Sequence, residues 1–286
     1  MGGATRAERA VAPRRAPAQL RARPTREIRV SAPRSIGTPT ELPALDAVLF
    51  DAGGTLVRLD FEWMAMAITQ LGARVEVEAL RRGEIEGRRR YDRSRGQKDV
   101  VAQPLGASGD VRAYLGGMLS AAGLPHYMIG PAIVRLLARD RTSGLWTRPA
   151  EGAKEALAAV AEMGLRCAVV SNSDGRAEAL LARCGLLGGV EFVLDSHLEG
   201  VEKPDPRIFG TALERLGVSP ERALFVGDIR SVDEVGARMA GMRFVLIDPY
   251  GDYAPQGVAT IRGIGALPEF VSSTFTAPRV AARAAG

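Results

Sequence analysis

Apolar positions along the chain form short runs that alternate with longer stretches of helical periodicity. The runs that predict buried strands are Leu45–Phe50, Arg166–Val170, Val190–Leu194, Ala223–Val226 and Arg243–Ile247. Helical patterns lie between them at Ala150–Glu162, Arg176–Cys184, Asp205–Leu216 and Val232–Ala240. Short buried strands that alternate with helices are typical of a parallel sheet covered on both faces. The expected fold class is therefore α/β.

One stretch, from Phe61 to Trp146, breaks this alternation because no comparable strand occurs in it. It contains only helical patterns, at Phe61–Leu71, Glu78–Arg93, Val111–Ala122 and Pro131–Arg139. We interpret it as an all-helical insertion after the first strand. An insertion on the carboxyl edge of the sheet would lie over the place where open α/β sheets bind their ligands.

The formal net charge of +5 is unevenly distributed along the 286 residues. Residues 1–40 hold nine arginines against Glu8 and Glu27, a net of +7, so the remainder carries −2. This first stretch is rich in Ala, Arg and Pro and cannot bury enough apolar surface to offset its ordering entropy. We therefore expect a disordered tail at 1–43 and a loose end at 272–286. The core is expected at 44–59 and 147–271, and the helical cap at 60–146.

The same features limit the partners and the compartment. Because the basic charge belongs to the tail, we expect no nucleic-acid binding. No apolar run reaches the roughly 20 residues of a membrane helix, so no membrane partner is expected either. The two cysteines, Cys167 and Cys184, suggest neither a metal site nor a disulfide framework. We expect a cytoplasmic monomer or homodimer.

Polar side chains follow the predicted strands where each strand ends. They are Asp51 after the first strand, Ser171 and Asn172 after the second, Lys203 in the loop after the third, and Asp228 and Asp233 after the fourth. In a parallel sheet these ends share one edge. Asp51 and Asp228 together suit Mg²⁺, which uses few carboxylates and keeps several waters. Lys203 and Ser171 could then hold an anion against Asp51.

Lys203 is also unusual for its residue type. The chain contains only three lysines, Lys98, Lys154 and Lys203, among 38 basic residues. A lysine in a loop after a strand suggests a need for a compact point charge, which arginine does not supply.

These segments resemble, in order, the four motifs of the haloacid dehalogenase superfamily of hydrolases. The matching segments are Phe50–Leu56, Val170–Asn172, Glu202–Pro204 and Val226–Asp233. The resemblance spans roughly residues 45–270 and implies a Rossmann-like core with an all-helical (C1-type) cap inserted after the first strand. It also implies a phosphatase that acts on a small phosphorylated substrate.

The resemblance assigns a role to each motif residue. Asp51 would be the nucleophile and a Mg²⁺ ligand, with the backbone carbonyl of Gly53 and the Asp228 carboxylate as further ligands. Asp233 would support the metal shell or Lys203. Ser171 and the backbone amides of Ala52 and Asn172 would bind the phosphoryl group, and Lys203 would neutralise it. Attack by Asp51 would give an aspartyl-phosphate that water hydrolyses.

Gly53 departs from the pattern, because phosphatases of this superfamily usually carry an acid–base Asp there. Glycine cannot transfer a proton, and general acid–base catalysis is typically worth about 10²–10⁴-fold. Three alternatives follow: a slow phosphatase that uses water or a cap residue, an enzyme for leaving groups that need no proton, or a catalytically degenerate binding or scaffold protein. We favour a slow or specialised phosphatase.

Two related chemistries also have to be considered. Dehalogenases of the superfamily do not usually keep the first acid of the fourth motif, so Asp228 argues against carbon–halogen cleavage. Phosphonate-cleaving relatives use a cap lysine as a Schiff base, and Lys98 is the candidate in the predicted cap. We interpret Lys98 as a surface residue.

The predicted cap also holds an arginine cluster, Arg81, Arg82, Arg88, Arg89, Arg90, Arg93 and Arg95. It could capture an anionic substrate. The pairs Glu84–Arg88 and Glu86–Arg90, however, have the i,i+4 spacing that stabilises exposed helices. We therefore favour a solvated helix surface.

Overall fold

The computed structural model describes residues 42–96, 111–253 and 257–278. A six-stranded parallel sheet runs through it in the order β5-β4-β1-β6-β7-β8. The strands are β1 (Ala47–Phe50), β4 (Arg166–Ser171), β5 (Val193–Asp195), β6 (Ala223–Gly227), β7 (Arg243–Ile247) and β8 (Thr260–Ile261). The predicted parallel α/β fold is confirmed, and β1 lies near the centre, where it pairs with β4 and β6.

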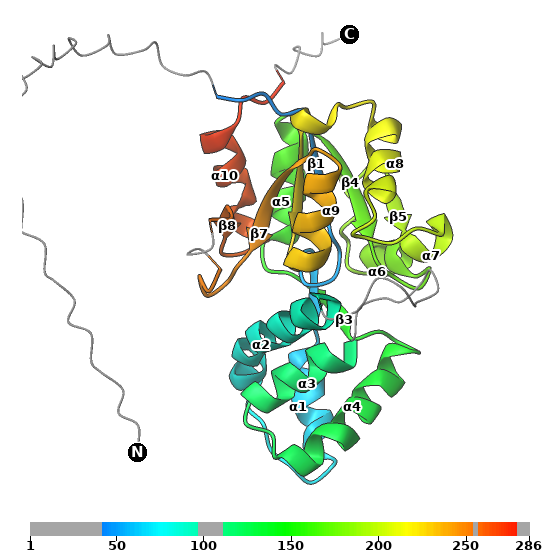
Figure 1. Ribbon diagram of the computed structural model, residues 1–286, viewed down its shortest axis with the longest axis vertical. Coiled ribbons are helices and arrows are strands. Elements are labelled where there is room, and N and C mark those ends of the chain that lie inside the picture. The colour runs from blue at the N-terminus through cyan, green and yellow to red at the C-terminus, as the bar shows by residue number, and fades with distance from the viewer. Residues whose placement is uncertain (1–41, 97–110, 254–256, 279–286) are drawn as a thin grey trace, which may run out of the picture. The chain divides into compact units, whose positions relative to one another are not determined.

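Alternate residues of β1 face opposite sides of the sheet and build two separate cores. Val48 and Phe50 pack with helices α5 (Ala153–Glu162), α6 (Ala177–Arg183) and α10 (Leu267–Thr274). Ala47 and Leu49 pack with α8 (Pro206–Leu216) and α9 (Val235–Met239) on the other face (Figure 1). This two-sided burial explains why the strand is an unbroken apolar run.

Between β1 and β4 the chain forms a two-stranded antiparallel ribbon and a set of helices. The ribbon pairs β2 (Val57–Leu59) with β3 (Trp146–Pro149). Along the chain, the helices follow β2 and precede β3. They are α1 (Phe61–Thr69), α2 (Val77–Gly96), α3 (Val111–Ala121) and α4 (His126–Asp140). They lie together beside the carboxyl edge of the sheet (Figure 1). Their buried side chains form an apolar core of their own. We call Phe61–Asp140 the helical insertion; the boundary residues expected for the cap stay predictions.

Several element boundaries differ from the sequence-based expectation, and two of the differences concern α4 and the last helix. Helix α4 begins at His126, directly after Pro125, so Pro131 lies inside the helix and not at its start. The end of the chain is ordered further than expected: α10 reaches Thr274, Phe275 is buried, and the Leu45 amide donates to the Thr276 carbonyl. Of the loose end expected at 272–286, residues 272–276 thus make regular contacts, and 279–286 lie outside the described residues. Residues 1–41 of the tail expected at 1–43 also lie outside them.

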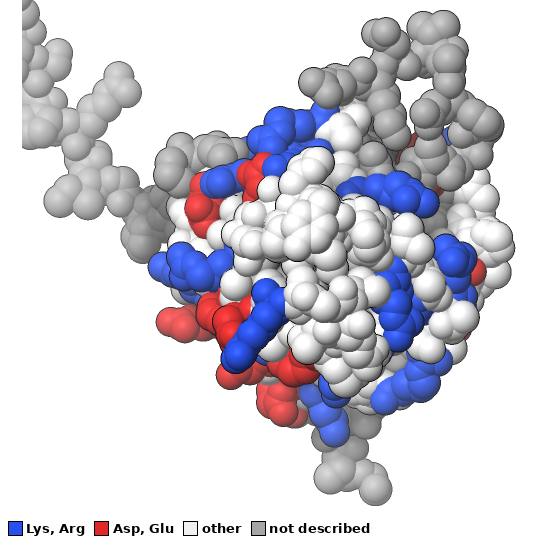
Figure 2. Space-filling model, turned by 90° about the horizontal axis from the view of Figure 1, so that it is seen from below, with Lys and Arg blue, Asp and Glu red and all other residues white. Residues whose placement is uncertain are grey.

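The end of the helical insertion that faces away from the sheet is shown in Figure 2. Basic and acidic side chains surround an uncharged centre on this face. The insertion also exposes apolar side chains on α1 and α4, among them Met66, Tyr127 and Val134. Charges of both signs therefore lie on this face. None of the helices in the described part of the chain is both long enough and apolar enough to cross a bilayer.

Candidate active site

Asp51 lies at the carboxyl end of β1, in a turn that requires glycine. Gly54 has φ +91°, and a Cβ on it would lie 2.1 Å from Asp228 Oδ2. The chain therefore turns in a conformation that L-residues rarely adopt, and it does so against the carboxylate at the end of β6. This close approach brings the carboxyl ends of β1 and β6 together.

Lys203 joins the third and fourth motifs to Asp51. Its side chain is 1% exposed, and Nζ lies 2.6 Å from Asp51 Oδ1 and 2.8 Å from Asp233 Oδ1. Asp233 Oδ2 accepts hydrogen bonds from the backbone amides of Asp228 and Ile229. Lys203 is therefore held between two carboxylates, and backbone amides fix the carboxylate of Asp233.

The second motif supports Lys203 from the other side. The Asn172 side chain donates to the Lys203 carbonyl at 2.9 Å and accepts from the Lys203 amide at 2.8 Å. Ser171 ends β4, is buried, and lines the same pocket as Asp51. The sequence assigned only the backbone amide of Asn172 to the site, so its side-chain clamp on Lys203 is a further feature.

Three aspartates, Asp51, Asp228 and Asp233, come close enough to share an ion. One carboxylate oxygen from each lies within 4.8 Å of the others, and all three side chains are buried. Asp51 Oδ2 and Asp228 Oδ1 have no hydrogen-bond partner among the described residues. Buried unpaired carboxylate oxygens are costly, and a hard divalent cation is the type of ligand that would satisfy both. The residues present therefore fit Mg²⁺.

Burial and neighbouring charges determine the protonation of the cluster. Burial raises the pKa of Asp51 to about 6, although Lys203 opposes the change. Burial also raises the pKa of Asp228 well above its ordinary value, against the opposing charge of Arg88. Burial by itself would lower the pKa of Lys203, but Asp233 and Asp51 outweigh it and raise that pKa. Lys203 is thus a permanent cation beside Asp51.

A pocket of about 890 Å³ opens over this cluster. Its wall includes Asp51, Gly53, Ser171 and Lys203 from the sheet edge, and Tyr114 and Trp146 from the insertion and its ribbon. A Cβ on Gly53 would lie 3.5 Å from the Trp146 indole, an ordinary contact distance. The Trp146 indole thus lies beside the space that an acid–base side chain at residue 53 would occupy.

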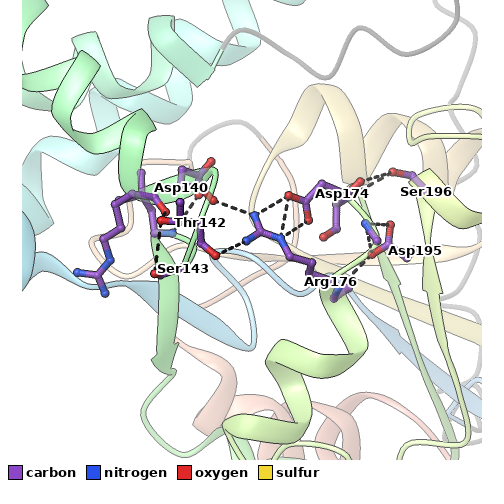
Figure 3. Close-up of polar contacts among 12 residues, drawn as sticks. Asp140, Thr142, Ser143, Asp174, Arg176, Asp195 and Ser196 are labelled. Atoms are coloured by element: carbon purple, nitrogen blue, oxygen red, sulfur yellow. Dashed lines mark hydrogen bonds and ion pairs between the residues drawn. The ribbon is translucent and has the colours of Figure 1, made fainter.

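Arg176 connects the loop after β4 to the end of α4 (Figure 3). Its Nε donates to Asp174 Oδ1 at 2.9 Å, and its two terminal nitrogens donate to the carbonyls of Thr142 and Asp140 at 2.9 and 2.8 Å. In the same loop, the Ser173 amide donates to Ser196 Oγ. The Arg176 side chain therefore connects the pocket-lining loop after β4 to the helical insertion.

The arginine cluster of α2 differs in part from the expectation of a solvated surface. Arg90 pairs with Glu86 at 3.1 Å, which confirms that i,i+4 pair. The prediction of an exposed Glu84–Arg88 pair is wrong, because both side chains are almost completely buried. Arg88 Nε lies 3.2 Å from Asp228 Oδ2, so this residue belongs to the carboxylate cluster.

Sequence reasoning also missed the other partners of Glu84. Arg58 forms an ion pair with it, and the Tyr114 hydroxyl donates to Glu84 Oε1 at 2.8 Å. The Glu84–Arg88 spacing was the only signal in the sequence. It does not reveal which face of a helix packs on the sheet.

The chain matches the family model described as haloacid dehalogenase-like hydrolase over residues 45–241. It belongs to the haloacid dehalogenase-like hydrolase family. The chain is 39% identical over 126 residues to haloacid dehalogenase-like hydrolase domain-containing protein 3 of Mus musculus, covering 44% of this chain and 50% of that protein. It thus spans only half of that relative's length.

A longer match is to N-acetylmuramic acid 6-phosphate phosphatase of Pseudomonas aeruginosa, 32% identical over 223 residues. That match covers 76% of this chain and 90% of the phosphatase. Among solved structures, a dehalogenase with an intermediate complex aligns with TM-score 0.53 and 24% identity, over 80% of this chain and 98% of that one. The structural likeness supports the Rossmann-like fold of this hydrolase.

Proposed function

We propose that this hydrolase is a Mg²⁺-dependent phosphatase that acts on a small phosphorylated metabolite through an aspartyl-phosphate on Asp51. The observation that carries the proposal is the pair of unpartnered oxygens, Asp51 Oδ2 and Asp228 Oδ1, beside a buried lysine. The phosphatase named among the longer matches supports the same reaction class. The cytoplasmic location and the monomeric or homodimeric state stay predictions.

Each residue of the cluster has a proposed part in the reaction. A carboxylate oxygen of Asp51 attacks phosphorus, and the bond between phosphorus and the leaving oxygen breaks. Lys203 and Ser171 hold the phosphoryl group, together with the amides of Ala52 and Asn172. Bound Mg²⁺, held by Asp51, Asp228 and the Gly53 carbonyl, would supply stabilisation of negative charge on the phosphoryl oxygens. Water then cleaves the acyl-phosphate bond and restores Asp51.

The absence of a proton donor at residue 53 makes this phosphatase slow or specialised. Because Gly53 has no side chain that could donate a proton, the oxygen of the leaving group takes its proton from water or from another group. Esters with acidic leaving groups depend least on such a proton. The proposal therefore predicts a preference for aryl over alkyl phosphates.

Phosphate release tests the proposal directly. We expect Mg²⁺-dependent release from p-nitrophenyl phosphate, slower release from an alkyl phosphate, and loss of both in Asp51→Asn. The matched control is Asp174→Asn, which changes a carboxylate of the pocket wall that pairs with Arg176. No release from either ester, with no Mg²⁺ binding, would instead favour a catalytically degenerate binding protein.

The other chemistries considered from the sequence have less support. The Schiff-base candidate, Lys98, lies outside the described residues. Asp228, which argues against carbon–halogen cleavage, lies within the cluster beside Asp51. A phosphoryl ester therefore stays the proposed substrate.

A further inference from the structure

Arg88 extends from the helical insertion to the edge of the sheet. It lies on α2, its side chain is 3% exposed, and Nη1 donates to the Ile247 carbonyl at 3.0 Å. Nε faces Asp228 Oδ2 at 3.2 Å, and Nη2 lies 3.6 Å from Glu84 Oε2. A buried guanidinium is thus fixed beside Asp228, one of the proposed metal ligands.

The carboxylate oxygens of the cluster divide into those with partners and those without. Lys203 occupies Asp51 Oδ1 and Asp233 Oδ1, and backbone amides occupy Asp233 Oδ2. Arg88 faces Asp228 Oδ2. The oxygens left over are one from Asp51 and one from Asp228. Lys203 therefore contacts one oxygen of Asp51, and Arg88 faces one oxygen of Asp228. The second oxygen of each of these two carboxylates has no partner among the described residues.

We propose that Arg88 is a positioning residue that acts through Asp228 and sets how tightly the cluster binds Mg²⁺. This inference rests on the proposed Mg²⁺-dependent function. A fixed positive charge beside Asp228 repels a second cation on the same carboxylate, and low solvent access strengthens that repulsion. Arg88 therefore weakens Mg²⁺ binding relative to a cluster without it, and raises the Mg²⁺ concentration at which the site fills.

An opposing effect has to be weighed, because Arg88 also holds the Asp228 carboxylate in place. Gly54 limits that effect, since its backbone lies so close to Asp228 that a Cβ there would be 2.1 Å from Oδ2. The backbone of Asp228 is also held at the sheet edge by the hydrogen bond that its amide donates to Asp233 Oδ2. The backbone of Gly54 thus limits how far the Asp228 carboxylate can turn without Arg88, and we expect the charge effect to dominate.

The same contact connects the metal to the helical insertion. Because a divalent ion on Asp228 Oδ1 competes with the guanidinium for the negative charge of that carboxylate, Mg²⁺ weakens the attraction between α2 and the sheet edge. Arg88 protons should then exchange faster with solvent in the Mg²⁺-loaded protein.

The test is the dissociation constant for Mg²⁺, measured by calorimetry on the full chain without substrate. Arg88→Met removes the charge and keeps an unbranched side chain, while Glu84 retains Arg58 and Tyr114 as partners. Arg89→Met is the matched control, because Arg89 is the next residue of α2 and pairs with Asp252 on a partly exposed surface. We expect Arg88→Met to bind Mg²⁺ at least tenfold more tightly than the wild type, and Arg89→Met to stay within about twofold, since exposed charges are screened.

Unchanged or weaker binding in Arg88→Met, with Mg²⁺ binding intact in the wild type, would overturn the inference and leave the proposed function standing. If neither protein binds Mg²⁺, the Mg²⁺-dependent function fails together with it. Should Arg88→Met not fold, exchange of the Arg88 Nε proton in the wild type, followed by NMR, decides the matter. Faster exchange with added Mg²⁺ supports the inference, and unchanged exchange contradicts it.

Discussion

At the scale of single residues, Asp51 and Lys203 form a buried ion pair whose cost depends on pH. Lys203 keeps its charge because two carboxylates contact its Nζ. Asp51 loses solvation, and its pKa rises to about 6. An unfolded aspartate titrates near 3.8, so the folded metal-free protein holds this proton more tightly than the unfolded chain. The stabilisation from that proton is present at low pH and is lost as the pH rises through 6.

Replacing Asp51 by Asn removes this dependence. In EDTA, we expect the free energy of unfolding of Asp51→Asn, relative to the wild type, to increase by up to about 3 kcal/mol between pH 4 and pH 7. Urea unfolding at several pH values measures it. Asp46→Asn is the control, because Asp46 lies on the surface in a pair with Arg222. A difference that stays constant across this range would contradict the raised pKa.

Gly53 is the residue that, in the proposed function, limits which leaving groups the site accepts. A Cβ there fits against the Trp146 indole, so Gly53→Asp introduces a proton donor at an ordinary contact distance. We expect hydrolysis of an alkyl phosphate to rise, by up to about 10²–10⁴-fold, because general acid catalysis is worth that much. Hydrolysis of p-nitrophenyl phosphate should change much less. Gly53→Asn, which has the same shape but no acid, should raise neither rate, and an equal gain with Asn would refute the explanation.

At the scale of elements, the turn after β1 and the end of β6 depend on each other. Gly54→Ala places a methyl group into Asp228 at a residue with φ +91°. We expect a loss of at least about 2 kcal/mol of stability, from backbone strain and from the collision. Gly72→Ala separates these two effects, since Gly72 has φ +90° but no atom within 4 Å of its Cβ position. An equal loss in both variants would mean that the close approach to Asp228 has no energetic consequence.

Arg176 makes a second connection between elements, from the loop after β4 to the end of α4 (Figure 3). Arg176→Gln should speed amide hydrogen exchange across residues 140–146 by several-fold, while global stability changes by less than about 1 kcal/mol because the pair is largely exposed. Arg207→Gln provides the control: Arg207 pairs with Asp205 in the same i,i−2 arrangement. Unchanged exchange in Arg176→Gln would show that this arginine does not restrain the insertion.

Much of the sheet edge could be predicted from the sequence, because parallel strands bring their carboxyl ends together. Asp51, Ser171, Lys203, Asp228 and Asp233 follow from that rule. Arg88 does not, since Glu84 and Arg88 have the same spacing on a solvated helix as on a buried one. Only the contacts of Arg88 with Asp228, which follows β6, and with the Ile247 carbonyl at the end of β7 distinguish the two cases. The place of Trp146 beside Gly53 likewise depends on the ribbon of β2 and β3, which apolar periodicity did not reveal.

At the scale of the whole molecule, a parallel sheet provides the carboxylates and a helical insertion provides part of the pocket wall and one cation. The pocket of about 890 Å³ lies where both contribute residues. The family match fixes the hydrolase class, whereas the substrate depends on the wall of this pocket. The central claim is therefore that Asp51 and Asp228 hold a divalent ion and that Asp51 accepts a phosphoryl group.

Binding of beryllium fluoride, a mimic of the aspartyl-phosphate, tests that claim most directly, with fluorine NMR as the readout. In the presence of Mg²⁺, the wild type should show one bound fluoride species that disappears in Asp51→Asn and in Asp228→Asn and persists in Asp174→Asn. A bound species that survives in Asp51→Asn, or no bound species in the wild type at saturating Mg²⁺, would contradict the account.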